Sequence, residues 1–436
     1  MGTDAKVLFV TAYCDERKGY EYWNESINKQ VKYSYDISGS YGLRFIKENI
    51  PEINILEYPT FKRYVQELKK GYDVVGFSFY THEIPSILNM VKAARAHNVP
   101  ELWAGNYGAL TYGVKEHFDK VFVGYGEGWI AEQLGHHLET IKHPIMVDRV
   151  NLPFGLGAFP VGILYTARGC TIGCHFCQAS VFCEENSTIP LRSIDDAIKT
   201  YKGLGIDEIL VLDEHFGLNR RHSELVVELL RSYGMNWYPL TSIDMLYKHL
   251  DIWYENGLAG AFMGIESLNQ RNLDEVHKKL KVEQIELLFR DLEEFDIFIN
   301  GTYIIGYEND TETLVKNSID RLNEFSIDIL QINVLTPLPR TKLWDHIDER
   351  YGIFERDWSK WDAKNLVWNH PHISKKDMKG LLNWCSYHAY PPQRLIQTPV
   401  KYFNLHKKRL GMPNTVKKVF SDVVSVNKKI TKNSLP

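Results

Sequence analysis

The chain has 436 residues, of which 44% are hydrophobic and 24% are charged, and its formal net charge at pH 7 is −4. This length is enough for two or three domains, and the composition is ordinary for a soluble globular protein. No run of eighteen apolar residues occurs, which excludes a helix that spans a membrane. Six cysteines, three of them clustered, argue against a disulfide framework, and the start of the chain carries no signal-peptide pattern. We therefore expect a protein of a reducing compartment, the cytoplasm.

The first part of the chain alternates between apolar strands and helices. The strand pattern occurs at residues 6–12, 54–58, 73–79, 101–105 and 120–124, and the helix pattern at 41–48, 61–70, 84–96 and 128–140. Strands that are apolar on both faces and alternate with helices indicate a parallel sheet covered on both sides. We therefore predict a doubly wound α/β domain over residues 1–145, with any ligand at the carboxyl ends of its strands.

Three cysteines form the most informative motif of the chain. After a stretch rich in proline and glycine, residues 146–160, which is predicted to be a linker, Cys170, Cys174 and Cys177 follow with the spacing C-x3-C-x2-C. Thiolates at this spacing can bind three irons of one [4Fe–4S] cluster, which leaves the fourth iron open to a substrate or cofactor. Phe176 would shield such a cluster from water. The alternative is a zinc site, which requires a fourth Cys or His at ligand spacing.

This stretch resembles the signature of the radical S-adenosylmethionine (SAM) superfamily, including the aromatic residue before the third cysteine. The resemblance implies a [4Fe–4S] cluster whose open iron chelates the amino and carboxylate groups of SAM. It also implies reductive cleavage of SAM to a 5′-deoxyadenosyl radical that abstracts hydrogen from an unactivated carbon. A reductant such as flavodoxin or ferredoxin would supply the electron.

The domain ahead of the cysteines resembles the cobalamin-binding-like domain that precedes many radical SAM cores. Residues 73–79 and 124–128 match its recurring segments in type and position. Two features depart from the pattern, because the chain has no D-x-H-x-x-G loop and because residues 104–108 replace the usual Gly-Gly pair. The resemblance therefore leaves open whether the domain binds cobalamin or serves as a scaffold. Methylthiotransferases are excluded, since they carry three further cluster cysteines in this domain and only Cys14 is present here.

The core of the chain, residues 161–350, repeats a strand–helix unit six times. The predicted strands are 163–167, 208–213, 237–243, 260–266, 301–306 and 329–335, and Ser193 is predicted to cap a helix over 193–204. Six parallel strands with outer helices make a partial (βα)6 barrel, the form that the radical SAM resemblance also implies. Active groups of such a barrel lie at the carboxyl ends of its strands.

Polar residues gather at those strand ends. Asp213, Glu214 and His215 follow the second strand and are candidate catalytic groups, as is the thiol of Cys183. For His215 and Cys183 the alternatives are a structural histidine and a plain thiol. By the resemblance, the candidate cofactor-binding residues at these strand ends and in the cysteine loop are Phe176, Ser242, Glu266 and Thr336. A carboxylate such as that of Glu266 can accept hydrogen bonds from ribose hydroxyls or from an ammonium group, and the alternative is a surface or helix-capping carboxylate.

The last segment, residues 351–436, is aromatic-rich and is predicted to be mainly helical and to close the barrel. From Lys401 onward it holds nine Lys or Arg residues and one acid, Asp422, so this tail carries +8 and the rest of the chain −12. Val416, Phe420 and Val424 fall on one face of a helix in the tail. Such a helix packs on the acidic body of its own protein or lies on an acidic membrane surface. Nothing accompanies the charge that would indicate nucleic-acid binding.

These observations predict a radical SAM enzyme that acts on a small-molecule or lipid substrate. The leading hypothesis is cobalamin-assisted C-methylation in a biosynthetic pathway. The alternatives are a cobalamin-independent rearrangement, dehydration or C–C bond formation and, from another class, a protein that only transfers electrons or senses redox state.

Overall fold

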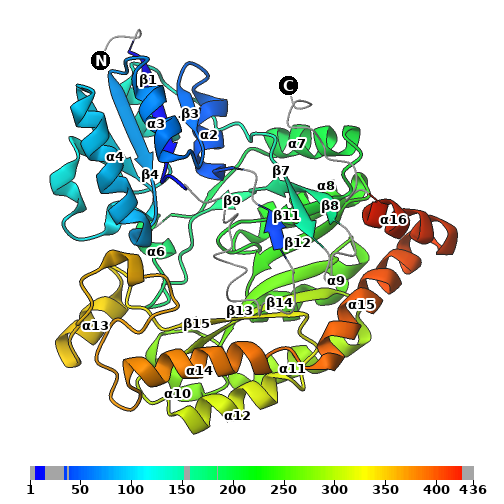
Figure 1. The fold of residues 1–436 in the computed structure, drawn as a ribbon. Coiled ribbons are helices and arrows are strands. Elements are labelled where there is room, and N and C mark those ends of the chain that lie inside the picture. Colours follow the sequence, from blue (N-terminus) through cyan, green and yellow to red (C-terminus); the bar gives the residue numbers. More distant parts are fainter. Residues whose placement is uncertain (1–4, 15–33, 37–38, 152–157, 184, 425–436) are drawn as a thin grey trace.

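The computed structural model describes residues 5–14, 34–36, 39–151, 158–183 and 185–424. Figure 1 shows an N-terminal α/β unit at the upper left beside a larger half-barrel, with helices at the C-terminal end of the chain along the lower and right edges. None of the described helices combines the length and the apolar character that crossing a membrane requires.

The N-terminal unit is built on a sheet of five parallel strands in the order β3-β1-β4-β5-β6. The strands are β1 (Val7–Thr11), β3 (Asn54–Leu56), β4 (Val74–Ser78), β5 (Glu101–Gly105) and β6 (Lys120–Val121). One face shares a core with helices α3 (Phe61–Leu68) and α4 (Ile84–Ala96), and the other shares a core with α2 (Tyr41–Asn49) and α5 (Glu127–Gln133). The predicted doubly wound sheet is confirmed.

The strand order of this sheet fixes where a ligand can bind. The second strand in chain order, β3, and the third, β4, lie on opposite sides of β1, so the chain leaves β1 and β4 in opposite directions. Such a switch point opens a crevice beyond the carboxyl ends of the strands. Here the crevice faces the half-barrel.

Two predicted elements of this unit are shorter than expected. The helix predicted over 128–140 ends at Gln133, because Gly135 adopts a φ of +81° and the amide of His136 turns back to bond the carbonyl of Ala131 at 2.8 Å. The strand predicted over 120–124 ends at Val121, and the chain turns away at Gly124, where φ is +119°.

Residues 146–160, predicted to be a linker, are partly strand. β7 (Val147–Asn151) pairs antiparallel with β8 (Ala158–Leu164), and β2 (Ser34–Asp36) pairs with the far side of β7. Val147 and Val150 pack against the barrel core, which is why this segment joins the sheet. The central part of the stretch, residues 152–157, lies outside the described residues.

The second sheet has eight strands in the order β15-β14-β13-β12-β11-β8-β7-β2, and its first six are parallel. After β8 these strands are β11 (Glu208–Val211), β12 (Asn236–Thr241), β13 (Gly260–Glu266), β14 (Phe298–Ile305) and β15 (Ile329–Val334). The helices between and after them are α7 (Leu191–Gly203), α8 (Arg220–Ser232), α9 (Ile243–Glu255), α10 (Gln270–Glu275), α11 (Val282–Asp291), α12 (Glu312–Leu322) and α13 (Lys342–Arg350). This is the predicted partial (βα)6 barrel, although its first strand covers 158–164 rather than 163–167.

The segment between β8 and α7 carries the cysteine loop. It contains the short helix α6 (Ala179–Phe182) and two two-residue strands, β9 (Ala167–Arg168) and β10 (Ser187–Thr188), which pair antiparallel at its two ends. The predicted cap of α7 was wrong, since Pro190 precedes the first turn and its fixed φ of −55° starts the helix two residues earlier. The hydroxyl oxygen of Ser193 instead accepts a hydrogen bond from the amide of His143 at 2.7 Å.

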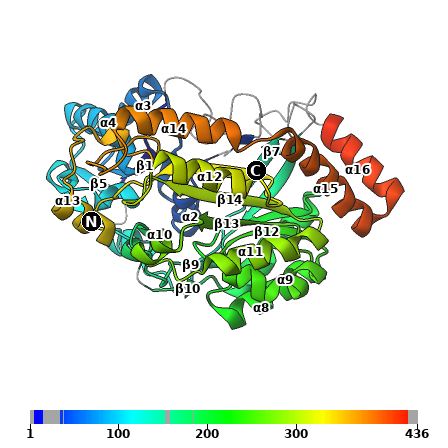
Figure 2. The same cartoon turned by 90° about the horizontal axis from the view of Figure 1, so that it is seen from below.

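The C-terminal segment is mainly helical, as predicted. Figure 2 shows α14 (Lys375–His388), α15 (Pro392–Leu410) and α16 (Met412–Val424) in succession along one side of the half-barrel. The basic tail packs on its own protein here, because three lysine–acid pairs tie it to the body: Lys401 to Asp328 at 3.0 Å, Lys408 to Asp296 at 2.6 Å and Lys418 to Glu208 at 3.2 Å. The tail lysines at 428, 429 and 432 lie outside the described residues.

Candidate active site

A cavity of about 1790 Å³ lies between the carboxyl ends of the N-terminal sheet and the half-barrel. It is bordered by the loops after β1, β4, β5 and β6, by the cysteine loop and by inward-facing residues of the barrel strands. Ordinary small-molecule pockets are about 300–1,000 Å³. The cavity is therefore large enough for more than one ligand at a time.

The cysteine loop places its three thiols on the wall of this cavity. Cys170, Cys174 and Cys177 are free and partly buried, and all three line the cavity. Burial raises the pKa of each thiol, to about 11 for Cys177. Gly169 starts the loop at a φ of +83°, where a Cβ atom would lie 2.0 Å from the carbonyl oxygen of Glu185. This position therefore requires glycine.

The donor set fits an iron–sulfur cluster. Among the described residues, no three His, Cys, Asp or Glu side chains are gathered closely enough to hold one metal ion. A cubane spreads three thiolates over three separate irons, so this spacing agrees with a cluster. The backbone of His175, in the middle of the loop, bonds to Val276 and Leu343 at 2.9 Å each, which anchors the loop to the barrel.

Glu266 ends β13 and lines the same cavity as the cysteines. The strand is irregular between Gly264 and Glu266, and Glu266 has a φ of +65°, a conformation that is rare outside glycine. Its carboxylate accepts hydrogen bonds from Lys278 at 3.0 Å and from Thr302 at 3.5 Å. Strained backbone of this kind clusters at functional sites. The structure therefore places Glu266 on the cavity wall, where it is buried, and not on the outer surface of the protein.

Lys278 was missed by the sequence reasoning. It follows α10 in a basic run with no recognisable motif, yet its ammonium lines the cavity beside Glu266. Burial acts to lower the pKa of Lys278, but the negative charges of the Glu266 carboxylate and of a Cys174 thiolate outweigh it and raise the pKa. The lysine is therefore a fixed positive charge next to the cysteine loop.

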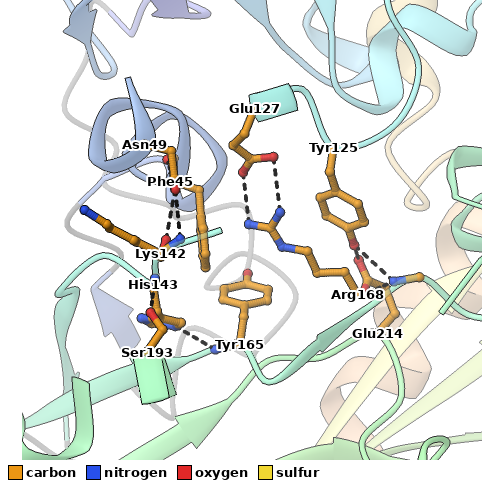
Figure 3. Close-up of polar contacts among 11 residues, drawn as sticks. Phe45, Asn49, Tyr125, Glu127, Lys142, His143, Tyr165, Arg168, Ser193 and Glu214 are labelled. Carbon is orange, nitrogen blue, oxygen red and sulfur yellow. Dashed lines mark hydrogen bonds and ion pairs between the residues drawn. The ribbon is translucent and has the colours of Figure 1, made fainter. Parts of the chain in front are cut away.

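Glu214 links the cysteine loop to the N-terminal unit (Figure 3). One carboxylate oxygen accepts a hydrogen bond from the Tyr125 hydroxyl, and the other accepts one from the amide of Gly169 at 3.0 Å. Tyr125 belongs to the loop after β6, so three distant segments meet at this carboxylate. Burial, and then the charge of Glu214, raise the pKa of Tyr125, which keeps the phenol protonated as a donor.

A buried ion pair reinforces the same junction. Arg168, two residues before the first cysteine, donates to both carboxylate oxygens of Glu127 at 2.9 and 3.1 Å. Its guanidinium also lies over the rings of Phe45 and Tyr125, 4.0 and 4.6 Å from their centroids. Figure 3 shows this arginine between the two units. The start of the cysteine loop is thus held by the N-terminal unit.

His143 occupies the other side of this junction. Its imidazole bonds the amide of Tyr165 at 2.9 Å and packs edge-on against Phe45, 5.0 Å between ring centroids (Figure 3). Burial lowers the pKa of His143 to about 3, so the ring is neutral and can accept that hydrogen bond.

The three residues after β11 have different positions. Glu214 and His215 line the cavity, whereas Asp213 is buried beneath it and accepts hydrogen bonds from the amide and the hydroxyl of Thr166, at 2.6 and 2.5 Å. Burial raises the pKa of Asp213 to about 7 and lowers that of His215 to about 4. Asp213 therefore fixes the turn between β8 and β9 in this structure.

Ser242 and His215 form a pair at the cavity wall. The Ser242 hydroxyl bonds the imidazole at 2.7 Å and donates to Asp244 at 2.6 Å, while its oxygen caps α9. Phe176 also lines the cavity. Thr336 and Cys183 are not among the lining residues: the Thr336 hydroxyl donates to the carbonyl of Val334 at 3.0 Å, and the Cys183 thiol to that of Glu185 at 3.2 Å.

Comparison with known proteins identifies the barrel. Residues 164–322 match the model of the radical SAM superfamily. An uncharacterized methyltransferase of Pyrococcus horikoshii is 24% identical over 239 residues, which cover 53% of this chain and 52% of that protein. The anaerobic magnesium-protoporphyrin IX monomethyl ester cyclase of Cereibacter sphaeroides is 25% identical over 233 residues, which cover 51% of this chain and 38% of that protein. The chain thus matches about half the length, or less, of these curated relatives.

A solved structure matches almost the whole chain. It is the radical SAM methyltransferase TsrM of Kitasatospora setae with cobalamin and a [4Fe–4S] cluster bound, which has a TM-score of 0.63 at 13% identity and covers 96% of this chain and 99% of that one. At this identity the similarity concerns the fold, and it extends over both α/β units and the helical C-terminal segment.

Proposed function

Because residues 164–322 are a radical SAM domain, we propose that this protein is a radical SAM enzyme that methylates an unactivated carbon with the help of cobalamin. The observation that carries the proposal is the shared cavity, in which the three thiols face the switch point of a doubly wound sheet. When bound, a [4Fe–4S] cluster supplies the electron that cleaves SAM, and a corrinoid supplies the methyl group. The similarity to methyltransferases supports this reaction over the alternatives.

The residues proposed to hold the cluster and SAM lie around the cysteine loop. Cys170, Cys174 and Cys177 would ligate three irons. Lys278 is a half-buried cation beside them, suited to the carboxylate of SAM, and Glu266 is a buried carboxylate suited to its ammonium group or ribose hydroxyls. Their mutual ion pair keeps both groups in place before SAM arrives. Phe176 and Ser242 would complete this part of the site.

The corrinoid would lie against the N-terminal sheet. Gly105 ends β5 at the cavity wall, and a Cβ atom there would meet only two carbonyl oxygens, at 3.9 and 4.0 Å, so open space lies beyond it. Tyr80 and Tyr107 stack on each other at 6.1 Å along the same wall and offer a flat apolar surface. These features fit a broad planar ligand. The proposal assigns the corrinoid to an N-terminal domain over residues 1–145, and the cluster and SAM to a barrel domain over residues 161–350.

The cellular setting follows from the chemistry. A reducible cluster needs an electron donor such as flavodoxin or ferredoxin, and oxygen lability favours the cytoplasm. Contact of the basic tail with an acidic membrane surface, predicted for the helix that includes Val416 and Val424, stays a prediction, and this helix packs on the body of the chain through Lys418 and Glu208.

The test is an anaerobic reconstitution of the full chain with iron, sulfide and hydroxocobalamin, followed by SAM and dithionite. We expect about four irons per chain, the visible spectrum of a protein-bound corrinoid, and SAM-derived 5′-deoxyadenosine and S-adenosylhomocysteine. Bound cluster and 5′-deoxyadenosine without retained corrinoid would favour the cobalamin-independent alternative. A cluster that never cleaves SAM, with any reductant and with extracts as a substrate source, would contradict the enzyme and favour an electron carrier.

Gly264→Ala is predicted to weaken SAM binding. A Cβ atom at this position would lie 1.9 Å from Oε1 of Glu266 and 2.9 Å from Nζ of Lys278, so the ion pair must shift. We expect the KM for SAM to rise about tenfold, the order that misplaced ligand-binding groups cost, with the iron content unchanged. The matched control is Gly128→Ala in α5, where a Cβ atom meets nothing within 4 Å. Equal KM values in the two variants would contradict the role of the pair.

A further inference from the structure

Helix α16 packs on the half-barrel with its polar side. Thr415 is fully buried, and the Lys418 ammonium pairs with Glu208 at 3.2 Å and lies over the ring of Phe159, 5.9 Å from its centroid. Residues three apart share one face of a helix, so Thr415 and Lys418 mark the side that contacts the body of the chain. This is not the apolar face that the sequence predicts for the helix, so that face is left for another contact.

The other side of α16 faces outward and carries apolar residues. Met412 and Val416 are 49% and 52% exposed, and Lys417 beside them is exposed as well. By helical spacing, the positions of Val416, Phe420 and Val424 follow one another along the side opposite the one packed on the barrel. A helix whose apolar line points away from its own protein is suited to bind a second surface.

The charges around this helix favour an acidic surface. The chain before Lys401 carries −12, whereas the tail from Lys401 onward carries +8. Three lysines of the tail, Lys401, Lys408 and Lys418, pair with acids of the body. Lys407 and Lys417 are exposed, and neither forms an ion pair with a residue that the structure describes. An anionic partner is therefore attracted to this end of the molecule and repelled by the acidic body.

We propose that the outward face of α16 binds the surface of an anionic membrane and holds the enzyme there. The apolar positions would enter the boundary between head groups and acyl chains, with Lys407 and Lys417 among the anionic head groups. A symmetric contact with a second copy would instead bring two positive tails together, which like charges oppose.

The position of α16 fits this role. Figures 1 and 2 both show it at the right-hand end of the molecule, away from the N-terminal unit. The preceding helix, α15, lines the cavity with Thr398 and Leu405 among other residues. The membrane-bound helix would therefore follow directly on a wall of the cavity.

The test is sedimentation of the full, reconstituted chain with vesicles. One set of vesicles is phosphatidylcholine alone, and the other is phosphatidylcholine and phosphatidylglycerol in equal parts. We expect binding to the anionic vesicles to be at least about tenfold tighter than to the neutral ones, since each lysine near an anionic surface contributes about 1 kcal/mol, or about fivefold. We also expect binding to weaken as added salt shortens the range of this attraction.

Two variants, each with a matched control, locate the contact. Val416→Asp is expected to reduce the affinity for anionic vesicles at least about tenfold, because it removes an apolar group and adds a negative charge. Its control is Leu314→Asp, at a position 46% exposed on α12. Lys417→Gln removes one positive charge and is expected to reduce the affinity about fivefold. Its control is Lys92→Gln, at an exposed position of α4 in the N-terminal unit, and both controls are expected to bind as the unaltered chain does.

Several outcomes would overturn the proposal. Absence of binding to anionic vesicles, or equal binding to neutral ones, would remove the membrane as the partner. Binding that Val416→Asp leaves unchanged would assign the contact to the charge of the tail alone. Dimers in solution that Val416→Asp separates would show that this face joins two copies of the chain.

Two further measurements keep these outcomes distinct. Each variant changes an exposed side chain, and its melting midpoint reports on the fold. None of the altered residues lines the cavity, so 5′-deoxyadenosine formation without vesicles is expected to be the same in all variants. That measurement reports on the proposed function, on which the membrane contact does not depend.

Discussion

Cys174→Ala is expected to abolish both the cluster and the chemistry. With two thiolates left, the loop cannot hold a cubane by three irons, and its anchors at His175 keep it from rearranging around a new ligand. We expect iron and sulfide to fall to background and 5′-deoxyadenosine formation to drop by more than about a hundredfold, since residues that merely support metal ligands already cost 10- to 100-fold. Iron analysis, the visible spectrum and product chromatography measure the three effects.

Cys183→Ala is the control for this experiment. The thiol of Cys183 is near the loop in sequence but bonds the carbonyl of Glu185 and does not line the cavity. Its variant is expected to keep the full iron content. An equal loss of iron in both variants would show that the cluster depends on a different set of cysteines, and a loss of product with normal iron would give Cys183 a catalytic role.

Arg168→Ala is expected to cause the largest loss of stability. The side chains of Arg168 and Glu127 are 5% and 4% exposed, so removal of the arginine leaves a buried carboxylate without a counter-charge. Breaking a buried pair in this way costs about 3–5 kcal/mol. We expect the free energy of unfolding, measured with urea, to fall by that amount, and the melting midpoint to fall with it.

Two controls separate the buried charge from the loss of an arginine. The double variant Arg168→Met, Glu127→Leu removes both charges and is expected to be more stable than Arg168→Ala, since apolar replacement of a buried pair is often close to neutral. Arg220→Ala removes an exposed arginine that pairs with Glu224 on α8, and it is expected to leave unfolding unchanged. A double variant no more stable than the single one would mean that packing of Arg168 against Phe45 and Tyr125, rather than its charge, holds the junction.

Local patterns in the sequence were sufficient for the architecture and for the cysteine loop. Apolar runs separated by helical periodicity predicted both sheets, because the central strands, such as β1 and β11, are buried on both faces and their pattern does not depend on their neighbours. Errors arose where a neighbour decides the structure. Residues 147–151 form a strand because β8 and β2 pair with them, and the glycine and proline content of the surrounding stretch gave no sign of those partners.

In the site, too, residues were recognised from local patterns and missed where a distant partner decides their role. Glu266 was predicted from its position after an apolar strand, and the structure places it on the cavity wall. Lys278 and Tyr125 were not recognised as site residues, because their roles depend on Glu266 and Glu214, which are 12 and 89 positions away in the chain. Asp213 was grouped with Glu214 by adjacency, yet successive residues at a strand end point in different directions, and one of the two is buried beneath the cavity.

The wall of the cavity that α15 provides is made last. During synthesis every strand of the half-barrel and the whole cysteine loop leave the ribosome before residue 392, where α15 begins. Until then the cavity is open on this side. A polypeptide that stopped short of α15 would retain all three cysteines of the loop, together with Glu266 and Lys278, but would lack the residues of α15 that line the cavity. Such a fragment would be expected to keep the cysteine loop but not to enclose the cavity, so translation past α15 is itself a condition for the finished site.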